Sequence, residues 1–434
     1  MTDLRTVRGM RDLMGKEMLI KEYLLAMATE VFRQFGYEPL DSPVMELWET
    51  LSAKGGEEVE AETFKFKDKG DRDVGLRFDL TVPLARIVAS NPHLPKPFKR
   101  YATGKAWRYD RPQLGRYREF GQADVDIIGA ASPAADTEVI LVALEYLRRV
   151  LGKDYLIRVN NRKILKGLIE KAGVPEELAY ECFRVIDKLD KIGIDGVKKE
   201  LKERGIDPKQ SEFLLVGISI KGKGLETLAR FRELLQDSES GDVGIRELEV
   251  MAEIFEQSNV KNLVEFDMSL ARGLDYYTGP VFEIAYLGEP QVGSIGAGGR
   301  YDNLIEKFGG PATPATGISL GIDRLIDILM PREQIEDLEV SLDVYIAPIG
   351  EEMVKYASEI QNKLVREGLS CEVDLMGRPL KKLLDQADSK KSRFVVIVGP
   401  RDIEKGEVSL RDMNSKETRQ IKLANVVEEV LKML

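Results

Sequence analysis

The sequence predicts an α/β protein with more than one domain, on three observations. Strand-like segments at about 75–82, 98–108 and 119–129 have helical patterns outside them, which favours an antiparallel or mixed sheet. The stretch from about 161 to 258 then shows repeated helical spacing with charged faces and few strand signals. After a linker at about 330–340, strands and helices alternate, which predicts a small α/β domain with a mostly parallel sheet.

The remaining elements follow from local patterns. Apolar residues at helical spacing predict a helix over Lys16–Gln34, and FGYEPLDSPVMEL after it is typical of an extended strand. From about 262 the strand and glycine signals return, so the first domain resumes after the helical stretch. The predicted domains are therefore 1–330, interrupted by a helical insertion at 161–258, and 340–434.

Composition narrows the class of protein. The chain has 434 residues, of which 43% are hydrophobic and 32% charged, as expected of a soluble globular protein. No run approaches the roughly 20 apolar residues of a membrane helix. The N-terminus MTDLRTVRGMRD lacks the apolar region of a signal peptide. We therefore expect a cytoplasmic protein without a membrane partner.

The chain has few residues for metal or nucleophilic chemistry. Its one histidine, His93, lies in the proline-rich loop NPHLPKP, so a Ser-His-Asp triad or a multi-histidine metal site would rest on one loop residue. The two cysteines, Cys182 and Cys371, are expected to be core thiols. Catalysis is expected to use carboxylates, arginines, tyrosines, backbone amides or an oxygen-bound cation such as Mg²⁺.

Charge is unevenly distributed. The net charge of −10 argues against a broad phosphate-binding surface, yet residues 96–118 hold eight basic residues against Asp110, a net of +7. Aromatic residues in this segment favour stacking on bases over a merely solvated face. Residues 378–393 hold six basic residues against two aspartates, a net of +4. A solvated helix face and contacts to single-stranded bases both explain that second cluster.

Two predicted strands carry polar faces. Arg77, Asp79 and Thr81 alternate with apolar residues in LRFDLTVP. Gln122, Asp124 and Asp126 alternate in the same way in GQADVDIIG. A sheet that exposes these faces to water is one interpretation. If both line one cleft, they offer carboxylates and an amide to a cationic amine, close to basic residues that can bind phosphates.

The spacing of glycines in this sequence does not match the common nucleotide-binding motifs. The glycines of GSIGAGGRYD do not fit G-x-G-x-x-G, and the chain has no G-x-x-x-x-G-K-[ST]. An ATP site in this chain is therefore of another kind.

Several long segments resemble one family. LARGLDYYTGPVFE and AGGRYD resemble the two histidine-specific signatures of the histidyl-tRNA synthetases, which are class II aminoacyl-tRNA synthetases. WRYDRPQLGRYREFGQADVDIIG resembles motif 2 of that class, and GISLGIDRL resembles motif 3. The first helix with FGYEPLDSPVME resembles the motif 1 dimer element, and VRGMRDLM resembles the N-terminal stretch of the family. The resemblance covers essentially the whole chain, with the motifs in the order of the family.

The resemblance implies a fold and a function. The fold would be an antiparallel six-stranded catalytic sheet flanked by helices, with an anticodon-binding α/β domain at 340–434, in a homodimer. The activity would be two-step ligation of L-histidine to tRNA-His. ATP and histidine would first form histidyl-adenylate, with Mg²⁺ on the phosphates, and the 3′-terminal adenosine of the tRNA would then take the histidyl group. No metal-ligating residue is assigned.

The resemblance also implies roles for eleven residues. Asp79, Thr81 and Gln122 would hold the α-amino group of histidine, and Asp126, Tyr276 and Tyr277 would surround the imidazole. Arg108 and Arg324 would clamp the ATP phosphates, Arg116 would hold the γ end, and Phe120 would stack on adenine. Arg272 would lie at the reacting carboxylate and α-phosphate. Arg108 and Arg272 would therefore be the catalytic residues, and both would also bind histidine. Many relatives have Glu in place of Asp79 and Asp126, so the contact geometry here differs by one methylene each.

One alternative from another class stays open on the sequence alone. A regulatory or sensor module with a synthetase-like fold would bind histidine or tRNA without aminoacylation. Histidine-dependent exchange of pyrophosphate into ATP discriminates between the two.

Overall fold

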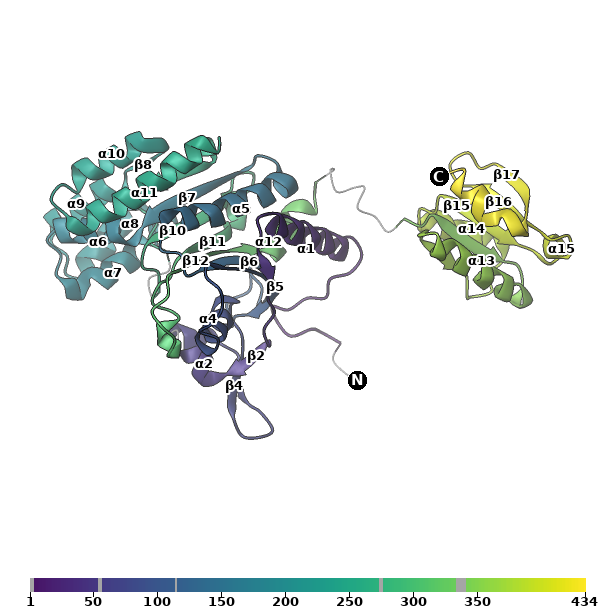
Figure 1. The fold of residues 1–434 in the computed structure, drawn as a ribbon, viewed down its shortest axis with the longest axis horizontal. Coiled ribbons are helices and arrows are strands. Elements are labelled where there is room, and N and C mark those ends of the chain that lie inside the picture. The colour runs from purple at the N-terminus through teal and green to yellow at the C-terminus, as the bar shows by residue number, and fades with distance from the viewer. Residues whose placement is uncertain (1–3, 54–56, 114, 273–275, 333–340) are drawn as a thin grey trace. The chain divides into compact units, whose positions relative to one another are not determined.

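The computed structural model describes residues 4–53, 57–113, 115–272, 276–332 and 341–434. The chain divides into two compact units, Met1–Ile335 and Glu336–Leu434 (Figure 1). Each unit has its own buried core, and each is described by itself below. No helix among the described residues is long and apolar enough to cross a membrane.

A large sheet organises the first unit. Its strand order is β1-β5-β6-β12-β11-β10-β7-β9-β8. The six central strands are β5, β6, β12, β11, β10 and β7, and each pairs antiparallel with its neighbours among the six, as expected from the resemblance. β1 pairs parallel to β5 at one edge, and β9 pairs parallel to β7 near the other. The strands are β1 (Glu38–Pro39), β5 (Phe98–Trp107), β6 (Glu119–Ile128), β7 (Tyr155–Asn161), β8 (Lys221–Gly222), β9 (Val264–Asp267), β10 (Pro280–Tyr286), β11 (Ser294–Arg300) and β12 (Ala315–Gly321).

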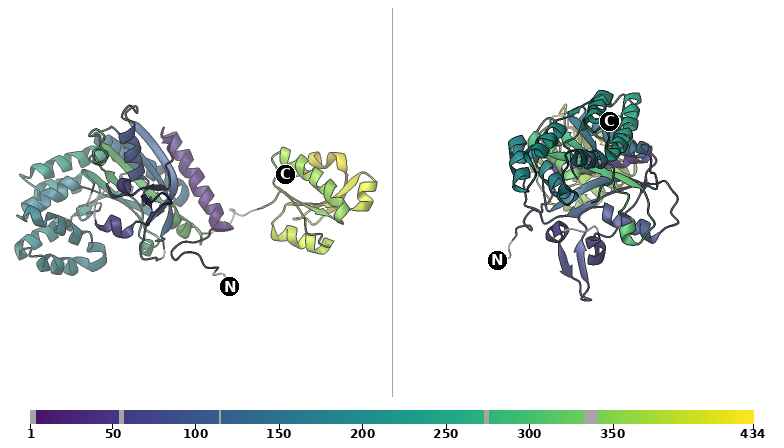
Figure 2. Two further views of the ribbon diagram at one scale, coloured as in Figure 1. Left: turned by 90° about the horizontal axis from the view of Figure 1, so that it is seen from below. Right: turned by 90° about the vertical axis from the view of Figure 1, so that its left-hand side faces the viewer.

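Three helices cover one face of this sheet (Figures 1 and 2). They are α1 (Lys16–Gln34), α5 (Pro133–Leu151) and α12 (Ile322–Leu329), and α1 packs against both others. Local signals set the start of α5, because Ser132 accepts a hydrogen bond from the Ala134 amide and Pro133 occupies the first turn. The predicted first helix, Lys16–Gln34, has the same bounds as α1.

The opposite face carries α4 (Thr81–Ser90) and a small three-stranded sheet. That sheet has the order β2-β4-β3, and the short helices α2 and α3 come between β2 and β3 in the sequence. The bounds are β2 (Met45–Leu47), α2 (Trp48–Ser52), α3 (Glu57–Glu62), β3 (Lys65–Lys67) and β4 (Asp73–Leu76).

Two sequence predictions in this region are wrong. The segment 75–82 is not one strand, since β4 ends at Leu76 and α4 begins at Thr81. The Asp79 carboxylate causes the change, because it accepts hydrogen bonds from the amides of Thr81 and Val82 at the helix start. FGYEPLDSPVMEL is also not one strand, and instead contributes β1 and β2 to two different sheets.

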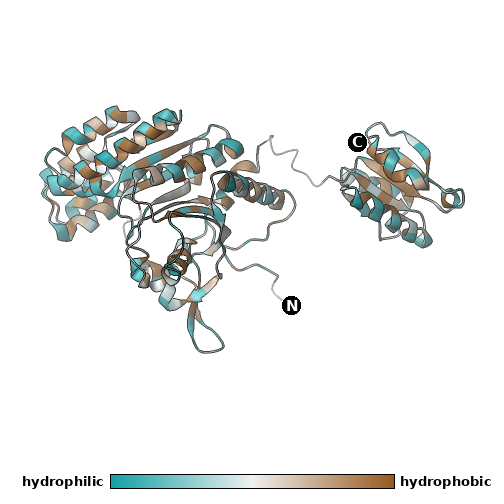
Figure 3. Cartoon of the chain, in the orientation of Figure 1, coloured by the Kyte–Doolittle hydropathy of each residue, from teal (hydrophilic) through white to brown (hydrophobic). Residues whose placement is uncertain are grey.

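Helices make up most of residues 162–257. They are α6 (Arg162–Lys171), α7 (Glu176–Ile186), α8 (Leu189–Glu203), α9 (Pro208–Ile218), α10 (Gly224–Leu234) and α11 (Glu239–Gln257). Helix α11 packs against α5, α6 and α10, and the short β8 pairs with β9 at the edge of the large sheet. Brown apolar and teal polar positions alternate along these helices in Figure 3, as expected of helices with one buried face.

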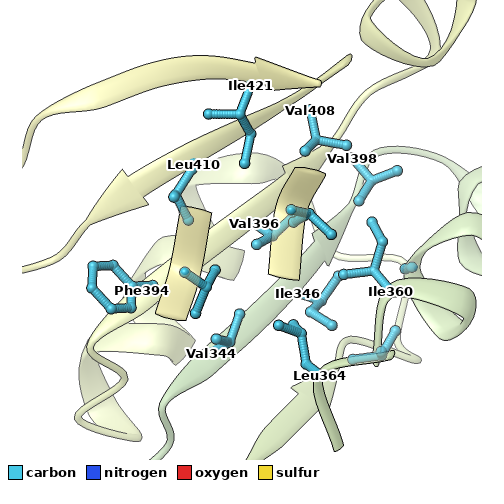
Figure 4. Close-up of a cluster of buried hydrophobic side chains, with 14 of the residues drawn as sticks. Val344, Ile346, Ile360, Leu364, Phe394, Val396, Val398, Val408, Leu410 and Ile421 are labelled. Atoms are coloured by element: carbon cyan, nitrogen blue, oxygen red, sulfur yellow. The ribbon is translucent and has the colours of Figure 1, made fainter. Parts of the chain in front are cut away.

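The second unit is a five-stranded sheet of order β14-β13-β15-β16-β17. β13 lies parallel to β14 and β15, while β16 and β17 add antiparallel pairs at one edge. Alternate residues of β13 face two cores, one of which Figure 4 shows around Val344 and Ile346. The elements are β13 (Val344–Pro348), α13 (Val354–Arg366), β14 (Cys371–Val373), α14 (Leu380–Ser389), β15 (Phe394–Val398), α15 (Pro400–Glu404), β16 (Glu407–Asp412), β17 (Thr418–Lys422) and α16 (Val426–Leu431).

Short 3₁₀ turns complete the chain. They are η1 (Lys261–Leu263), η2 (Pro290–Val292) and η3 (Glu306–Phe308) in the first unit, and η5 (Glu351–Met353) and η6 (Leu423–Asn425) in the second.

Candidate active site

A cavity of about 420 Å³ opens on the large sheet of the first unit. Its lining comes from β6, β11 and β12, from the start of α4 and α12, and from the segments around Arg116 and Tyr276. All eleven residues that the resemblance singles out line it: Asp79, Thr81, Arg108, Arg116, Phe120, Gln122, Asp126, Arg272, Tyr276, Tyr277 and Arg324. The structure therefore brings them together, while the role of each stays a prediction. Arg77, from the predicted polar face, turns away and donates to the carbonyls of Ser42 and Lys105.

Asp126 is held in a buried network. Its side chain lies 2.7 Å from the Arg100 guanidinium, and the Tyr301 hydroxyl donates to its Oδ1. Arg100 is fully buried and also donates to the Leu80 carbonyl at 3.1 Å. Burial raises the pKa of Asp126, while Arg100 and the hydrogen bond from Tyr301 act in the opposite direction. The network fixes the carboxylate in orientation at one end of the cavity.

Arg100 corrects the interpretation of residues 96–118 as one basic patch. Within this segment Arg100 is buried, Lys99 pairs with Glu138 at 2.6 Å, and Arg116 pairs with Asp110 at 2.7 Å. Because β5 alternates between two faces, its basic residues point to different surroundings. The single surface patch that the composition suggested is therefore wrong.

Two further carboxylates lie near Asp126. Asp79 is nearly buried, and its Oδ1 accepts from the amides of Thr81 and Val82. Asp124 occupies the middle of β6, and burial raises its pKa to about 7. On the same face, Gln122 donates through Nε2 to the hydroxyl of Ser319 on β12. This end of the cavity thus combines three carboxylates with an amide and a hydroxyl, a donor and acceptor set suited to a cationic amine and a ring N–H.

Arginines gather at the other end. Arg324 donates to the carbonyls of Gly115 and Ser294, and Arg108 donates to the Phe78 carbonyl at 3.0 Å. Burial lowers the pKa of Arg324, and the positive charges of Arg116, Arg272 and Arg108 lower it further. Mutual repulsion of this kind is relieved by a polyanion, so the cluster is suited to a polyphosphate.

An aromatic ring lies beside these arginines. The Arg108 guanidinium is 5.3 Å from the centroid of the Phe120 ring. A planar base can stack in such surroundings, where a ring and a guanidinium both offer flat faces.

Arg272 lies between the cavity and the helical region. Its Nη2 is 2.9 Å from Glu283 of β10, and its Nε is 3.9 Å from Asp187 after α7. Half of the side chain is exposed, so the guanidinium can contact a ligand in the cavity. Gly273, part of the segment that carries the signature, lies outside the described residues.

Tyr276 and Tyr277 follow this arginine by four and five positions in the sequence. Their ring centroids are 4.2 Å apart, and the Tyr276 centroid is 6.4 Å from that of Tyr301. Burial raises the pKa of Tyr276, so the hydroxyl is protonated at neutral pH.

Glycines on β11 and β12 keep the floor of the cavity open. A Cβ at Gly317 would overlap the Asp126 carboxylate, and one at Gly298 would overlap the Gly317 carbonyl. The requirement is close approach, since neither glycine has a positive φ.

Sequence reasoning missed four residues that support the site. Arg100 and Tyr301 hold Asp126, Glu283 holds Arg272, and Ser319 holds Gln122. Alternation within PVFEIAY and ATGISLG puts Glu283 and Ser319 opposite apolar neighbours, which is a signal for a polar face. Nothing in the sequence pattern links any of the four to its partner.

The fold and the site define a class II aminoacyl-tRNA synthetase: an antiparallel sheet on which one cavity has a carboxylate end and an arginine end. A family model described as histidyl-tRNA synthetase matches residues 9–325, and one described as an anticodon binding domain matches residues 343–433. The chain belongs to the histidyl-tRNA synthetase family.

Known relatives agree over the full length. "Histidine--tRNA ligase" of Pyrococcus furiosus is 40% identical over 426 residues, covering 98% of each chain. The protein of the same name from Aeropyrum pernix is 39% identical over 437 residues, covering 99% of this chain and 98% of the other. The crystal structure of histidyl-tRNA synthetase from Nostoc sp. PCC 7120 superposes with a TM-score of 0.82 at 30% identity, and the match covers 100% of both chains.

The chain is thus an enzyme that uses ATP to ligate histidine to tRNA, as the sequence predicted. The predicted fold class is confirmed as well. These matches do not favour the alternative of a regulatory or sensor module without aminoacylation.

Proposed function

We propose that the cavity is the aminoacylation site and that its two ends divide the substrates. The observation that supports this most is the separation of charge within one cavity. The charges of Asp126 and Asp79 raise the pKa of Asp124 at one end, while Arg108, Arg116 and Arg272 lower the pKa of Arg324 at the other. Histidine, with its ammonium and ring N–H, complements the first end, and ATP complements the second.

At the histidine end, the ring would lie between Asp126 and Tyr277, beside Tyr276. Asp126 accepts from one ring N–H, and Arg100 and Tyr301 hold its carboxylate in place for that contact. Asp79, Thr81 and Gln122 would hold the α-amino group. An apolar side chain of similar size would leave these buried groups unpaired, so rejection needs no editing step.

At the ATP end, Phe120 would stack on adenine, Arg108 and Arg324 would hold the phosphates, and Arg116 would hold the γ end. A carboxylate oxygen of histidine forms a bond to the α-phosphorus while the bond to the pyrophosphate oxygen breaks. The nucleophile is ionised at pH 7, so no general base is required. Arg108 and Arg272 stabilise the charge that develops on the α-phosphate.

Magnesium would enter with ATP as part of the substrate. Among the described residues, no group of three or more His, Cys, Asp or Glu side chains could hold a metal ion. Mg²⁺ characteristically keeps several waters and binds phosphate oxygens, so a dedicated protein site is not required.

In the second step, the 3′-terminal adenosine of tRNA-His attacks the adenylate carbonyl and AMP leaves. The segment from Asp110 to Arg118 would guide the acceptor end, and Arg116 pairs with Asp110 within it.

The two units would divide the work on tRNA. The first, predicted as the catalytic domain 1–330 with its insertion at 161–258, would activate histidine, and the domain 340–434 would bind the anticodon. Of the basic residues at 378–393, Arg378 pairs with Asp374 at 2.8 Å and Lys390 pairs with Glu372 at 3.0 Å. Lys381 and Lys382 at the start of α14 are exposed and would contact the nucleic acid.

The enzyme would act as a cytoplasmic homodimer. Three large apolar residues on and before β2 are substantially exposed: Val44 at 47%, Met45 at 45% and Leu47 at 49%. Val44 and Met45 belong to the motif 1 segment that the resemblance assigns to the dimer element, and Leu47 follows it directly. Burial of such residues between two copies is the expected source of association.

Pyrophosphate exchange tests the proposed site. Wild-type protein should exchange pyrophosphate into ATP with histidine and with none of the other nineteen amino acids. Arg324→Ala should raise the KM for ATP and leave the KM for histidine near its wild-type value. If the Arg324 variant instead changed only the histidine dependence, the division of the cavity into two ends would be wrong.

A further inference from the structure

Asp124 is a cavity-lining carboxylate to which the assigned roles give no contact with substrate. It lies in the middle of β6, is 2% exposed and lines the cavity. Its Oδ1 has no hydrogen-bond partner among the residues that the structure describes. A buried carboxylate oxygen without a partner is costly, and native proteins rarely keep one without a use.

The other two carboxylates are already engaged. The Asp126 carboxylate lies against Arg100 and accepts from Tyr301, and Asp79 Oδ1 accepts from two backbone amides. Asp124 faces Ala102 on one neighbouring strand and Ser319 on the other, and Ser319, which forms a side-chain hydrogen bond with Asp124, carries no charge. Asp124 Oδ1 is therefore a buried acceptor at this end that the described residues leave without a hydrogen bond.

The position of Asp124 fits one group of the substrate. Successive same-face residues of a strand lie roughly 7 Å apart, so Asp124 stands between Gln122 and Asp126. Those two residues are predicted to contact the α-amino group and the imidazole of histidine. A group between them lies under the Cα of a bound amino acid, within reach of an ammonium that carries three donors.

We propose that Asp124 is a further substrate-positioning residue, whose Oδ1 accepts a hydrogen bond from the α-ammonium group of L-histidine. The proposal rests on the proposed function of this end of the cavity. It adds a second anionic contact to the one predicted for Asp79, so that ligands without the ammonium bind weakly.

The electrostatic surroundings agree with this assignment. Burial raises the pKa of Asp124 to about 7, Arg100 and the hydrogen bond with Ser319 lower it, and the charges of Asp126 and Asp79 raise it again. The charge of Arg77, whose pKa burial lowers, also acts on Asp124. An incoming ammonium adds a cation in direct contact with the carboxylate, so histidine binding favours the ionised form.

The test pairs a residue change with a ligand change. Histidinol has the ammonium, and 3-(imidazol-4-yl)propan-1-ol lacks it. Both are measured as competitive inhibitors of histidine-dependent pyrophosphate exchange, with wild type and with Asp124→Asn. Because a hydrogen bond to a charged group contributes about 1.5–3 kcal/mol, the preference for histidinol should fall by roughly tenfold or more in the variant. The inhibition constant of the deamino compound should change by less than about threefold, since it makes no contact that the substitution removes.

The outcomes distinguish a wrong role for Asp124 from a wrong assignment of the histidine end of the cavity. An unchanged preference for histidinol in a folded Asp124→Asn variant would overturn the role of Asp124 alone. Failure of both compounds to compete with histidine in wild type would instead overturn the proposed histidine end.

A second measurement covers a variant that fails to fold. In wild type, the preference for histidinol, corrected for the imidazole pKa of each ligand, should rise between pH 6 and pH 8 as Asp124 ionises. A preference that stays flat over this range would overturn the proposal.

Discussion

Removal of Arg272 should abolish adenylate formation while the fold persists. Its guanidinium contacts Glu283 at 2.9 Å, and half of its side chain is exposed. Glu283 is buried and loses this partner in Arg272→Ala, so the free energy of unfolding should fall by about 1–3 kcal/mol. A mobile water cannot replace a fixed guanidinium between two anionic reactants, so the loss falls on the chemical step.

The expected loss in kcat for pyrophosphate exchange is roughly 10²- to 10³-fold, the effect of removing one preorganised donor. Arg272→Lys keeps the charge without the planar fork and should retain part of the activity. Asp187→Asn is the matched control, because Asp187 lies 3.9 Å from Arg272 outside the proposed contacts to substrate. That variant should stay within about threefold of wild type.

The assay is histidine-dependent exchange at saturating ATP, with thermal unfolding of each variant measured alongside. Exchange within about threefold of wild type by a folded Arg272→Ala variant would refute the argument, since a catalytic arginine contributes far more. Equal losses in Arg272→Ala and Asp187→Asn would point to a disturbed contact with the helical region instead.

Three further predictions follow from the contacts. A chain that ends at Arg332 should still form histidyl-adenylate and charge tRNA poorly, and efficient charging by this shorter chain would contradict the role of the second unit. Asp126→Asn should raise the KM for histidine roughly 10- to 100-fold with the KM for ATP nearly unchanged. The same substitution should also lower the free energy of unfolding by about 3–5 kcal/mol, because Arg100 loses its buried partner. A change in the KM for ATP alone would show that Asp126 does not face the imidazole. The pKa of Asp124, about 7, exceeds its unfolded value, so its contribution to stability is full below about pH 4 and is lost as the pH rises through 7. Asp124→Asn should therefore raise the Tm of the free enzyme more at pH 8 than at pH 5, and a shift independent of pH would contradict this.

Secondary structure was predicted correctly where residues close together in the sequence determine it. The helix over Lys16–Gln34 and the strands near 98–108 and 119–129 were predicted correctly, because each shows a sustained period along the chain. The strand expected at 75–82 was wrong, since apolar alternation there competes with the Asp79 cap, which starts a helix at Thr81.

The residues that line the candidate site were predictable as a set, whereas the network of contacts among them was not. The polar face of β6 and the arginines were visible in the sequence, and the structure places them in one cavity. The partners of these residues were not predictable, because Tyr301 and Asp126 are 175 residues apart and meet only through the order of the sheet strands. Composition likewise cannot separate a buried arginine such as Arg100 from an exposed one.

A crystal structure with a non-hydrolysable analogue of histidyl-adenylate tests the central claim most directly, because it shows both ends of the cavity occupied by one ligand. The imidazole should lie within hydrogen-bond distance of Asp126, the adenine should stack on Phe120, and Arg272 should contact the group that replaces the α-phosphate. An analogue bound with its adenine beside Asp126, or bound outside the cavity, would contradict the account.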